Sequence, residues 1–382
     1  MLRHSAGRPP LIAETADPMR IADLPTPSLV LDRRVLDANL ARMRGRAADL
    51  GVTLRPHLKT AKSDRVARLA HGGETGLITV STLAEAAYFL DRGFADMTYA
   101  VGVTPDKLPA LAELTARGAS IGLLTDDLEA ARAIGARGAE LGLVFPVHVE
   151  VDSGSGRGGL APDDPALVEI GRVVDAAPGA SLRGVLTHAG MSYQCDGPAA
   201  IRVVAERERA GAVAAADALR AAGLPCSVVS VGSTPTAAFA ESLDGVTEMR
   251  PGVYMFMDLF QAELGVCGES DIAVSVTASV VGHKPAANRL LIDAGALALS
   301  QDSSLPGYGR VAGAGDLRIA SVHQEHGFVE GPAPLPFDRY PVGARLRVLP
   351  NHACMTAAMY DRYYVVDGGD EVVDEWDRCR GW

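Results

Sequence analysis

Residues 120–151 read SIGLLTDDLEAARAIGARGAELGLVFPVHVEV, and this stretch repeats in outline along the chain as far as Asp258. Apolar runs suited to buried strands, at Ser120–Leu124 and Phe145–Val151, lie on either side of Leu128–Glu140, whose apolar residues recur with a helical period. A strand, a helix and a second strand in this order predict a βαβ unit with parallel strands.

Eight such strands are predicted in all. The other six are Thr53–His57, Leu77–Thr82, Met97–Val101, Gly184–Thr187, Ser227–Val231 and Val246–Arg250. Helices are predicted between them, among others at Leu83–Asp91, Pro105–Arg117, Pro165–Ala177 and Ala199–Ala222. Eight alternating units favour an α/β fold with a closed (β/α)8 TIM-type barrel over an open sheet. We expect this barrel to occupy residues 25–258.

The pattern changes after Asp258. Strand-like runs at Ala273–Val281, Arg289–Ile292, Arg345–Leu349 and Arg362–Val366 are separated by Gly- and Pro-rich loops without helices of comparable quality. They predict an additional C-terminal β-domain over residues 259–382. An early run, Ser28–Leu31, precedes the barrel and a helix at Arg33–Leu50, so it could join that β-domain. Residues 1–24 are expected to form a loosely held N-terminal arm.

Composition excludes several classes of partner. The formal net charge of −11 offers no basic surface for nucleic acid or an anionic membrane, and no segment approaches the roughly 20 apolar residues of a membrane span. Five scattered cysteines with no Cys-x-x-Cys pair do not suggest a disulfide framework. A cytoplasmic protein with reduced thiols is therefore expected.

Lys59 follows the first barrel strand in RPHLKTAK, residues 55–62. Active sites of such barrels lie where strands end, and a desolvated Lys near Arg55, His57 and Lys62 has a lowered pKa. Such an amine can form a Schiff base with an aldehyde. A solvated basic loop is the competing interpretation.

The loops after the seventh and eighth strands have the composition of a phosphate site. They read GSTPT from Gly232 and RPGVY from Arg250. Glycine lets the backbone approach an anion, while hydroxyl and N–H groups donate to it. The candidate cofactor-binding residues here are Gly232, Ser233, Thr234, Gly252 and Tyr254. Together with Lys59 they place an amine and a phosphate at one barrel mouth, as pyridoxal phosphate requires.

The chain resembles the fold-type III pyridoxal-phosphate family of alanine racemase, and within it the branch of D-threonine aldolases, D-serine dehydratases and D-threo-3-hydroxyaspartate dehydratases. The resemblance covers nearly the whole sequence. Its most specific parts are LPTPSLVLD (24–32), RPHLKT (55–60), THAG (187–190), GSTPT (232–236), QEHG (324–327) and PNHAC (350–354). It implies that Lys59 binds the cofactor covalently. Ala61 departs from many relatives, which have His or Ser there.

His352 and Cys354 form a candidate metal pair. They continue the predicted strand Arg345–Leu349 two residues apart, so both side chains are expected on one face. Imidazole and thiolate together suit zinc, with manganese, cobalt or magnesium as alternatives. A His-x-Cys sequence by itself is more often an accident of composition. The resemblance implies a metal here, in the Cys form that is more similar to the dehydratases than to the aldolases.

The remaining candidates each have a structural alternative. Arg157 could hydrogen-bond the pyridine nitrogen or be a solvated loop residue, and His188 could pack against the cofactor ring or serve the fold alone. Tyr193 is a possible acid or carboxylate contact, and His57 is a further catalytic candidate beside Lys59. Gln324 and His326 could contact substrate or orient a metal ligand.

The reaction that we expect is a β-elimination. Lys59 would remove the α-proton of a small β-hydroxy D-amino acid, and the metal would stabilise the departing hydroxide, giving a 2-oxo acid and ammonia. The D configuration rests on the resemblance alone, which also implies a head-to-tail homodimer. A second substrate carboxylate would need a cation, for which Arg310, Lys284 and Arg250 stay unranked.

Three alternatives stay open. A D-threonine aldolase would use the same metal but break the Cα–Cβ bond, giving glycine and an aldehyde. A non-catalytic pyridoxal-phosphate-binding protein would be a single barrel, whereas this chain adds over a hundred residues with their own motifs. A racemase is less attractive because it needs no metal.

Overall fold

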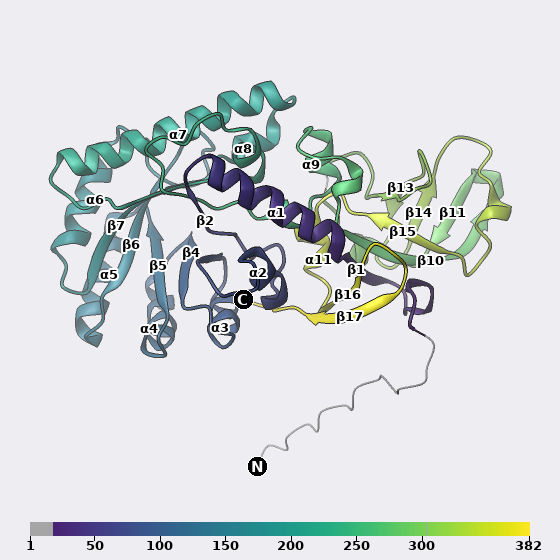
Figure 1. The fold of residues 1–382 in the computed structure, drawn as a ribbon, viewed down its shortest axis with the longest axis horizontal. Helices are drawn as coiled ribbons and strands as arrows, with labels where there is room; N and C mark the ends of the chain where they lie inside the picture. Colours follow the sequence, from purple (N-terminus) through teal and green to yellow (C-terminus); the bar gives the residue numbers. More distant parts are fainter. Residues whose placement is uncertain (1–17, 303) are drawn as a thin grey trace, which may run out of the picture.

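The computed structural model describes residues 18–302 and 304–382 (Figure 1). Most of the predicted arm, residues 1–17, therefore lies outside the described residues. The rest of the arm is not loosely held: Ile21 and Leu24 are buried in a small cluster with Val30 and Val366. The Ile21 amide also donates to the Asp370 carbonyl at 2.8 Å. Two apolar side chains suffice to fix this segment on the β-domain.

The barrel forms as predicted, with its eight parallel strands in the order β2-β9-β8-β7-β6-β5-β4-β3. Backbone hydrogen bonds then join the two ends, because Leu58 N donates to Thr79 O and Thr79 N to Pro56 O, both at 2.9 Å. The strands are β2 (Thr53–Leu54), β3 (Ile78–Val80), β4 (Asp96–Gly102), β5 (Ser120–Thr125), β6 (Phe145–Val151), β7 (Ala180–Thr187), β8 (Val228–Val231) and β9 (Glu248–Met249).

Helices surround the barrel, and the predicted ones are confirmed to within a few residues. They are α1 (Arg33–Asp49), α2 (Asp64–Ala70), α3 (Leu83–Leu90), α4 (Leu108–Ala116), α5 (Leu128–Leu141), α6 (Pro165–Ala176), α7 (Pro198–Ala221) and α8 (Thr234–Phe239). Polar side chains cap several of them, as Thr82, Asp127 and Asp164 do by accepting from backbone N–H groups of the first turn. Of the described helices, none is both long and apolar enough to cross a membrane.

The second domain is a nine-stranded sheet in the order β11-β14-β13-β12-β15-β10-β1-β16-β17, in which β10 also pairs with β11 and so closes six strands into a ring. The strands are β1 (Ser28–Asp32), β10 (Val274–Lys284), β11 (Arg289–Ile292), β12 (Arg310–Val311), β13 (Arg318–Val322), β14 (Gly327–Glu330), β15 (Arg345–Leu349), β16 (Arg362–Val366) and β17 (Val372–Asp377). The sequence did not predict β12, β13, β14 and β17, which are short and partly exposed.

β1 belongs to the β-domain, as its sequence allowed. It lies antiparallel to β10 and parallel to β16. α1 then leads from β1 to the barrel, and Figure 1 shows it running from the β-domain across to the barrel strands. Two short helices, α9 (Leu259–Glu263) and α11 (Ala353–Ala357), lie where the domains meet. The chain therefore crosses between the two domains twice, which helps to fix the barrel mouth against the β-domain.

Candidate active site

A cavity of about 660 Å³ lies between the carboxyl ends of the barrel strands and the β-domain. Eleven of the residues singled out in the sequence line it: His57, Lys59, Arg157, His188, Tyr193, Gly232, Ser233, Thr234, Gly252, His352 and Cys354. They come from the ends of five barrel strands, β2, β6, β7, β8 and β9, and from the other domain. Gln324 and His326 are not brought to this cavity, because they lie exposed at the tip of the β13–β14 hairpin.

Lys59 presents its amine to the cavity from the turn that follows β2. Desolvation lowers the pKa of Lys59, and the positive charges of Arg157 and Arg250 add to this effect, while Cys354 opposes it. Lys62 points elsewhere, since its ammonium lies 3.0 Å from the buried carboxylate of Glu85. Of the two lysines in this turn, Lys59 is therefore the one placed to react with a ligand in the cavity.

His57 is buried beside Lys59. Desolvation lowers the pKa of His57 well below its usual range, and the charge of Lys59 acts in the same direction. Its Nε2 lies 3.3 Å from the Ser81 hydroxyl. The ring is therefore neutral, and Ser81 is a polar neighbour on the cavity wall that the sequence did not reveal.

Two glycines, one in each of the loops after β8 and β9, let these loops pass close to neighbouring backbone at the cavity. Gly232 has a φ of +127°, and a Cβ there would lie 2.7 Å from the Arg250 nitrogen. A Cβ on Gly252 would lie 2.9 Å from the His57 carbonyl oxygen. Any side chain at either position would have to displace backbone, so these loops can only be built with glycine.

Hydroxyl groups tie the same two loops together. Ser233 caps α8 by accepting from Thr236 N at 3.2 Å, and its Oγ lies 2.8 Å from the Ser192 Oγ. The Thr234 Oγ1 accepts from the Tyr254 amide at 3.1 Å. The Tyr254 side chain itself is wholly buried and outside the cavity wall, and its hydroxyl finds no partner among the described residues. Tyr254 thus reaches the site only through its backbone, because its ring packs in the core.

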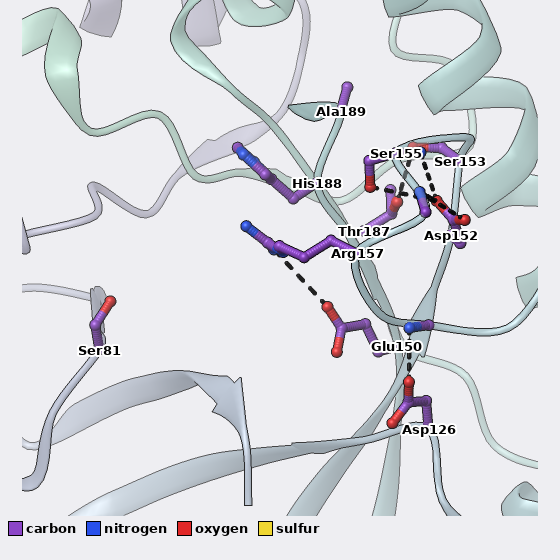
Figure 2. Close-up of polar contacts among 12 residues, drawn as sticks. Ser81, Asp126, Glu150, Asp152, Ser153, Ser155, Arg157, Thr187, His188 and Ala189 are labelled. Carbon is purple, nitrogen blue, oxygen red and sulfur yellow. Dashed lines mark hydrogen bonds and ion pairs between the residues drawn. The ribbon is translucent and has the colours of Figure 1, made fainter. Parts of the chain in front are cut away.

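Arg157 lies in the loop after β6, which is shaped by one carboxylate. Oδ1 of Asp152 accepts from the amides of Gly154, Ser155 and Gly156, at 2.8, 2.7 and 3.2 Å respectively. Arg157 contacts Glu150 at 3.9 Å and is otherwise open to the cavity. Figure 2 shows its side chain extending in the same direction as that of His188.

His188 and Tyr193 form an aromatic wall. Nδ1 of His188 donates to the Gly232 carbonyl at 3.0 Å, and desolvation lowers the pKa of His188 to about 3, so Nε2 is unprotonated. The Tyr193 ring lies 6.2 Å from His188 and stacks on Phe260 at 6.0 Å. Desolvation raises the pKa of Tyr193, which keeps its phenol protonated.

His352 and Cys354 meet on the β-domain side of the cavity. The reason predicted from the sequence, a shared face of one strand, was wrong. β15 ends at Leu349, and the chain turns so that His352 precedes α11 and Cys354 lies in its first turn. The two residues are two positions apart, and α11 begins between them at Ala353. The turn into this helix is what brings their side chains together. Burial alone would lower the pKa of His352, but Cys354 and Asp258 raise it to about 10.

Both side chains are oriented by neighbours that the sequence analysis did not single out. Nδ1 of His352 lies 2.7 Å from Oδ2 of Asp302, which leaves Nε2 for a ligand. The Sγ of Cys354 lies 3.1 Å from Oγ1 of Thr60. Burial opposes ionisation of Cys354, yet His352 and Lys59 lower its pKa overall. An ionised sulfur and an oriented imidazole are a suitable donor pair for a borderline metal.

This pair is not a complete coordination shell. Within residues 18–302 and 304–382, no three His, Cys, Asp or Glu side chains cluster in a way that could hold a metal ion. Structural zinc sites have four protein ligands, whereas catalytic sites have three and keep a position open for water or substrate. The pair is therefore nearer to an open, catalytic donor set than to a closed, structural one.

The structure distinguishes the three cations that the sequence left unranked as partners of a second substrate carboxylate. Arg250 lines the cavity, and its Nε donates to the Ser230 hydroxyl at 2.6 Å. Desolvation lowers the pKa of Arg250 to about 10. Arg310 instead pairs with Glu269, and Lys284 lies at the exposed end of β10. Of these three cations, Arg250 is the one that lines the cavity and could meet a second substrate carboxylate there.

Comparison with known proteins agrees with this architecture. The family model for the N-terminal domain of alanine racemase matches residues 31–259, and a serine dehydratase domain model matches residues 273–366. The D-threo-3-hydroxyaspartate dehydratase of Delftia sp. (strain HT23) is 46% identical over 94% of this chain and 98% of that protein. The D-serine dehydratase of Dictyostelium discoideum is 30% identical over 95% of this chain and 98% of its own length.

Solved structures give the same result. The Delftia dehydratase superposes with a TM-score of 0.91 at 44% identity, covering 95% of this chain and all of that one. A cysteine-to-alanine variant of the same enzyme in the metal-free form gives a TM-score of 0.92 at the same identity and coverage. Alanine racemase of Clostridium difficile, at 14% identity and a TM-score of 0.69, covers 91% of this chain and 97% of its own, and shares the fold.

Proposed function

The chain belongs to the family of the alanine racemase N-terminal domain, and from this premise we propose that it is a lyase dependent on pyridoxal phosphate and a divalent metal. It eliminates water from a small β-hydroxy D-amino acid of the D-threo-3-hydroxyaspartate or D-serine type. The products are a 2-oxo acid and ammonia. The D configuration and the substrate class follow from the names of its relatives.

One observation carries the proposal: Lys59 and the pair His352 and Cys354 line the same cavity. A base and a site for the departing hydroxyl group are both needed for β-elimination, and they come here from different domains. Pyridoxal phosphate, when bound, supplies an electron sink for the negative charge that develops at Cα. Lys59, Gly232, Ser233 and Gly252 are the residues that would hold it.

The proton at Cα is taken by Nζ of Lys59. Its lowered pKa gives a neutral amine near physiological pH more readily than an exposed lysine would. Because Lys59 lies on one wall of the cavity, it reaches the substrate from one face only. His57, which is neutral and buried beside Lys59, adds no positive charge of its own next to the amine.

The aromatic wall formed by His188 and Tyr193, together with Arg157, orients the substrate and cofactor. The neutral His188 ring is held by its hydrogen bond to Gly232 and offers a flat surface for an aromatic ring. The phenol of Tyr193, held protonated, can donate a hydrogen bond to a carboxylate or an oxygen leaving group. Arg157, pointing into the same space, can donate to the cofactor ring.

His352 and Cys354 would hold the divalent metal, for which zinc is our first choice because imidazole and thiolate suit it. Such an ion is a Lewis acid for the β-hydroxyl oxygen. Asp302 fixes the tautomer of His352, and Thr60 holds the sulfur. A related enzyme with a metal-free cysteine variant supports a functional metal in this family branch.

We also propose a cytoplasmic homodimer. The five cysteines are all free thiols, which suits a reducing compartment. Leu297 on α10 (Ala296–Leu299), Met355 on α11 and Met359 just after α11 are 43, 50 and 48% exposed, and the two helices pack together. Apolar groups gathered in this way are typical of a surface covered by another protein.

Product analysis tests the proposed reaction. Purified protein loaded with pyridoxal phosphate and zinc is incubated with D-threo-3-hydroxyaspartate, D-serine or D-threonine, and ammonia, oxo acid and glycine are assayed. We expect oxo acid and ammonia in equal amounts, with D-threo-3-hydroxyaspartate as the best substrate. Formation of glycine and an aldehyde would show that the protein is an aldolase and not a dehydratase. If none of the three amino acids is turned over, the proposal of a lyase is rejected.

A further inference from the structure

Arg378 follows the last strand, β17, and lies buried between the two halves of the active site. Only 6% of its surface is exposed. The backbone of this segment is fixed on both sides, because Arg378 N donates to Asp361 O at 2.9 Å and Cys379 N donates to Lys62 O at 2.7 Å. The end of the chain thus passes directly beneath the turn that carries Lys59.

On one side the guanidinium group of Arg378 binds that turn. Its Nη2 donates to the Thr60 carbonyl at 3.4 Å and its Nε to the Ala61 carbonyl at 3.2 Å. The Nε also lies 2.7 Å from the Tyr363 hydroxyl, which in turn donates to the Ala61 carbonyl at 2.7 Å. The two residues after Lys59 therefore have their carbonyl groups held by one buried side chain and its neighbour.

On the other side the same guanidinium group binds the end of α11, the helix that carries Cys354. Nη1 of Arg378 donates to the Ala357 carbonyl and, at 2.8 Å, to the Tyr360 carbonyl. Carbonyl groups at the end of a helix have no partner within the helix, so a cationic donor there satisfies them and also favours the helix dipole.

The acceptors of Arg378 are thus four backbone carbonyl oxygens and one hydroxyl. A buried charge whose partners are neutral is costly, and it persists where its geometry serves a purpose. The planar guanidinium group has donors that diverge in fixed directions, so it can join two separate segments at once. An ammonium group has three donors at a single point and cannot span them.

We propose that Arg378 is a positioning residue that holds the Lys59 turn and the Cys354 helix in register. At the cavity, the two segments touch through the contact between Thr60 and Cys354, so their register sets the position of Cys354 relative to the Lys59 turn. Arg378 touches neither substrate nor cofactor. The catalytic part of this inference rests on the proposed lyase function, whereas the coupling between the two segments does not.

Hydrogen exchange of the cofactor-free, metal-free protein tests the coupling without any activity. The variants are Arg378→Lys, which keeps the charge, and Tyr363→Phe, which removes one hydroxyl and is the milder change. The control is Arg362→Gln, because Arg362 lies on β16 and is exposed with its partner Glu375. We expect exchange in residues 58–63 and in residues 353–360 to rise together in both variants and to stay unchanged in the control. A rise in one segment alone, or in neither, would overturn the coupling.

Kinetics of the holoenzyme then test the catalytic consequence. Exchange of the substrate α-proton reports Lys59, and ammonia release also requires the metal pair. In Arg378→Lys we expect ammonia release to fall about tenfold or more, in the range known for residues that orient metal ligands, and α-proton exchange to fall less, because it needs the Lys59 turn but not the metal pair. Unchanged ammonia release, or a loss of α-proton exchange alone, would contradict the positioning role of Arg378. If the unmodified enzyme releases no ammonia, the proposed function fails, and the exchange experiment still decides the role of Arg378.

Discussion

The hydroxyl oxygen of Thr60 lies 3.1 Å from the sulfur of Cys354, although 294 residues separate them in the chain. Thr60 directly follows Lys59, so this contact joins the barrel turn that carries the proposed base to the helix that carries the proposed metal ligand Cys354. Hydrogen bonds to a ligand sulfur orient it and tune its basicity. The relative position of Lys59 and the proposed metal pair is thus fixed by groups of both domains.

Replacing Thr60 should therefore weaken the metal site. Thr60→Val keeps the shape and removes the hydroxyl, and we expect zinc affinity and ammonia release to fall about tenfold to a hundredfold. Thr60→Ser should restore most of both. Zinc affinity is measured by competition with a chelating dye. Wild-type affinity in Thr60→Val would show that the hydroxyl does not support the sulfur.

Removing the sulfur should separate metal binding from cofactor binding. In Cys354→Ala we expect zinc content to fall below half an equivalent and ammonia release to be lost, while the absorbance of the bound cofactor remains, because the residues proposed to hold it lie in the barrel. Cys195→Ser, a change at a thiol outside the cavity wall, is the matched control. Loss of cofactor absorbance in Cys354→Ala would show that the two sites are not separable.

Replacing the cysteine of the metal pair with aspartate tests whether this ligand decides between dehydration and aldol cleavage. Cys354→Asp should retain part of the zinc, since a carboxylate is also a zinc ligand. We expect some glycine and aldehyde from D-threonine, measured by chromatography after a long incubation. The control is the unmodified enzyme under the same conditions. An absence of both products despite bound zinc would mean that the ligand alone does not determine which bond breaks.

Borohydride should fix the cofactor on Lys59. We expect a labelled peptide containing Lys59 from the unmodified protein and no label in Lys59→Ala, identified by mass spectrometry. Lys62→Met should still be labelled at Lys59, although it leaves the buried Glu85 without its ion pair at 3.0 Å and should lower the stability. Label on Lys62 would reverse the assignment of the two lysines.

The lowered pKa of Lys59 predicts the pH dependence of cofactor capture. A neutral amine is the nucleophile, so the capture rate of cofactor-free protein should rise with pH and level off at a lower pH than for a lysine with the usual pKa of 10.5. Absorbance measures the rate, with free N-acetyl-lysine as the reference. Arg157→Met removes one of the charges that lower the pKa and should move the midpoint upward. A midpoint equal to that of the reference would show that the Lys59 amine is fully solvated.

Asp258 should be required for stability, because its carboxylate joins α9 to α11. Its two oxygens accept from Gln261 N and from Ala353 N, each at 2.9 Å. Asp258→Ala leaves both buried N–H groups unsatisfied, at a cost of about 1–3 kcal/mol each in the free energy of unfolding. Asp258→Asn retains one acceptor oxygen and should lose about half as much. Denaturant unfolding measures the difference, and equal stability of all three proteins would contradict it.

The sequence by itself determined the barrel, because apolar runs and helical periods are local signals that repeat eight times. It also predicted Lys59 as the reactive lysine and Gly232 and Gly252 as part of a phosphate site, since strand ends in a barrel necessarily share one mouth. Residues such as Lys59, Gly232 and Gly252 could be placed from their position after predicted strands. The four unpredicted strands of the β-domain, β12, β13, β14 and β17, gave no such signal, because two to six partly exposed residues carry little periodicity.

Only the tertiary structure decided which side chains face each other across the domain boundary. The register between Lys59 and Cys354 and the position of Arg378 depend on packing between segments hundreds of residues apart. The support of His352 by Asp302 joins two segments of the β-domain that are 50 residues apart. The tertiary structure also removed Tyr254, Gln324 and His326 from the cavity wall. A motif specifies which groups are available, but their distance and direction follow from how the two domains close on one another, and no local pattern encodes that contact.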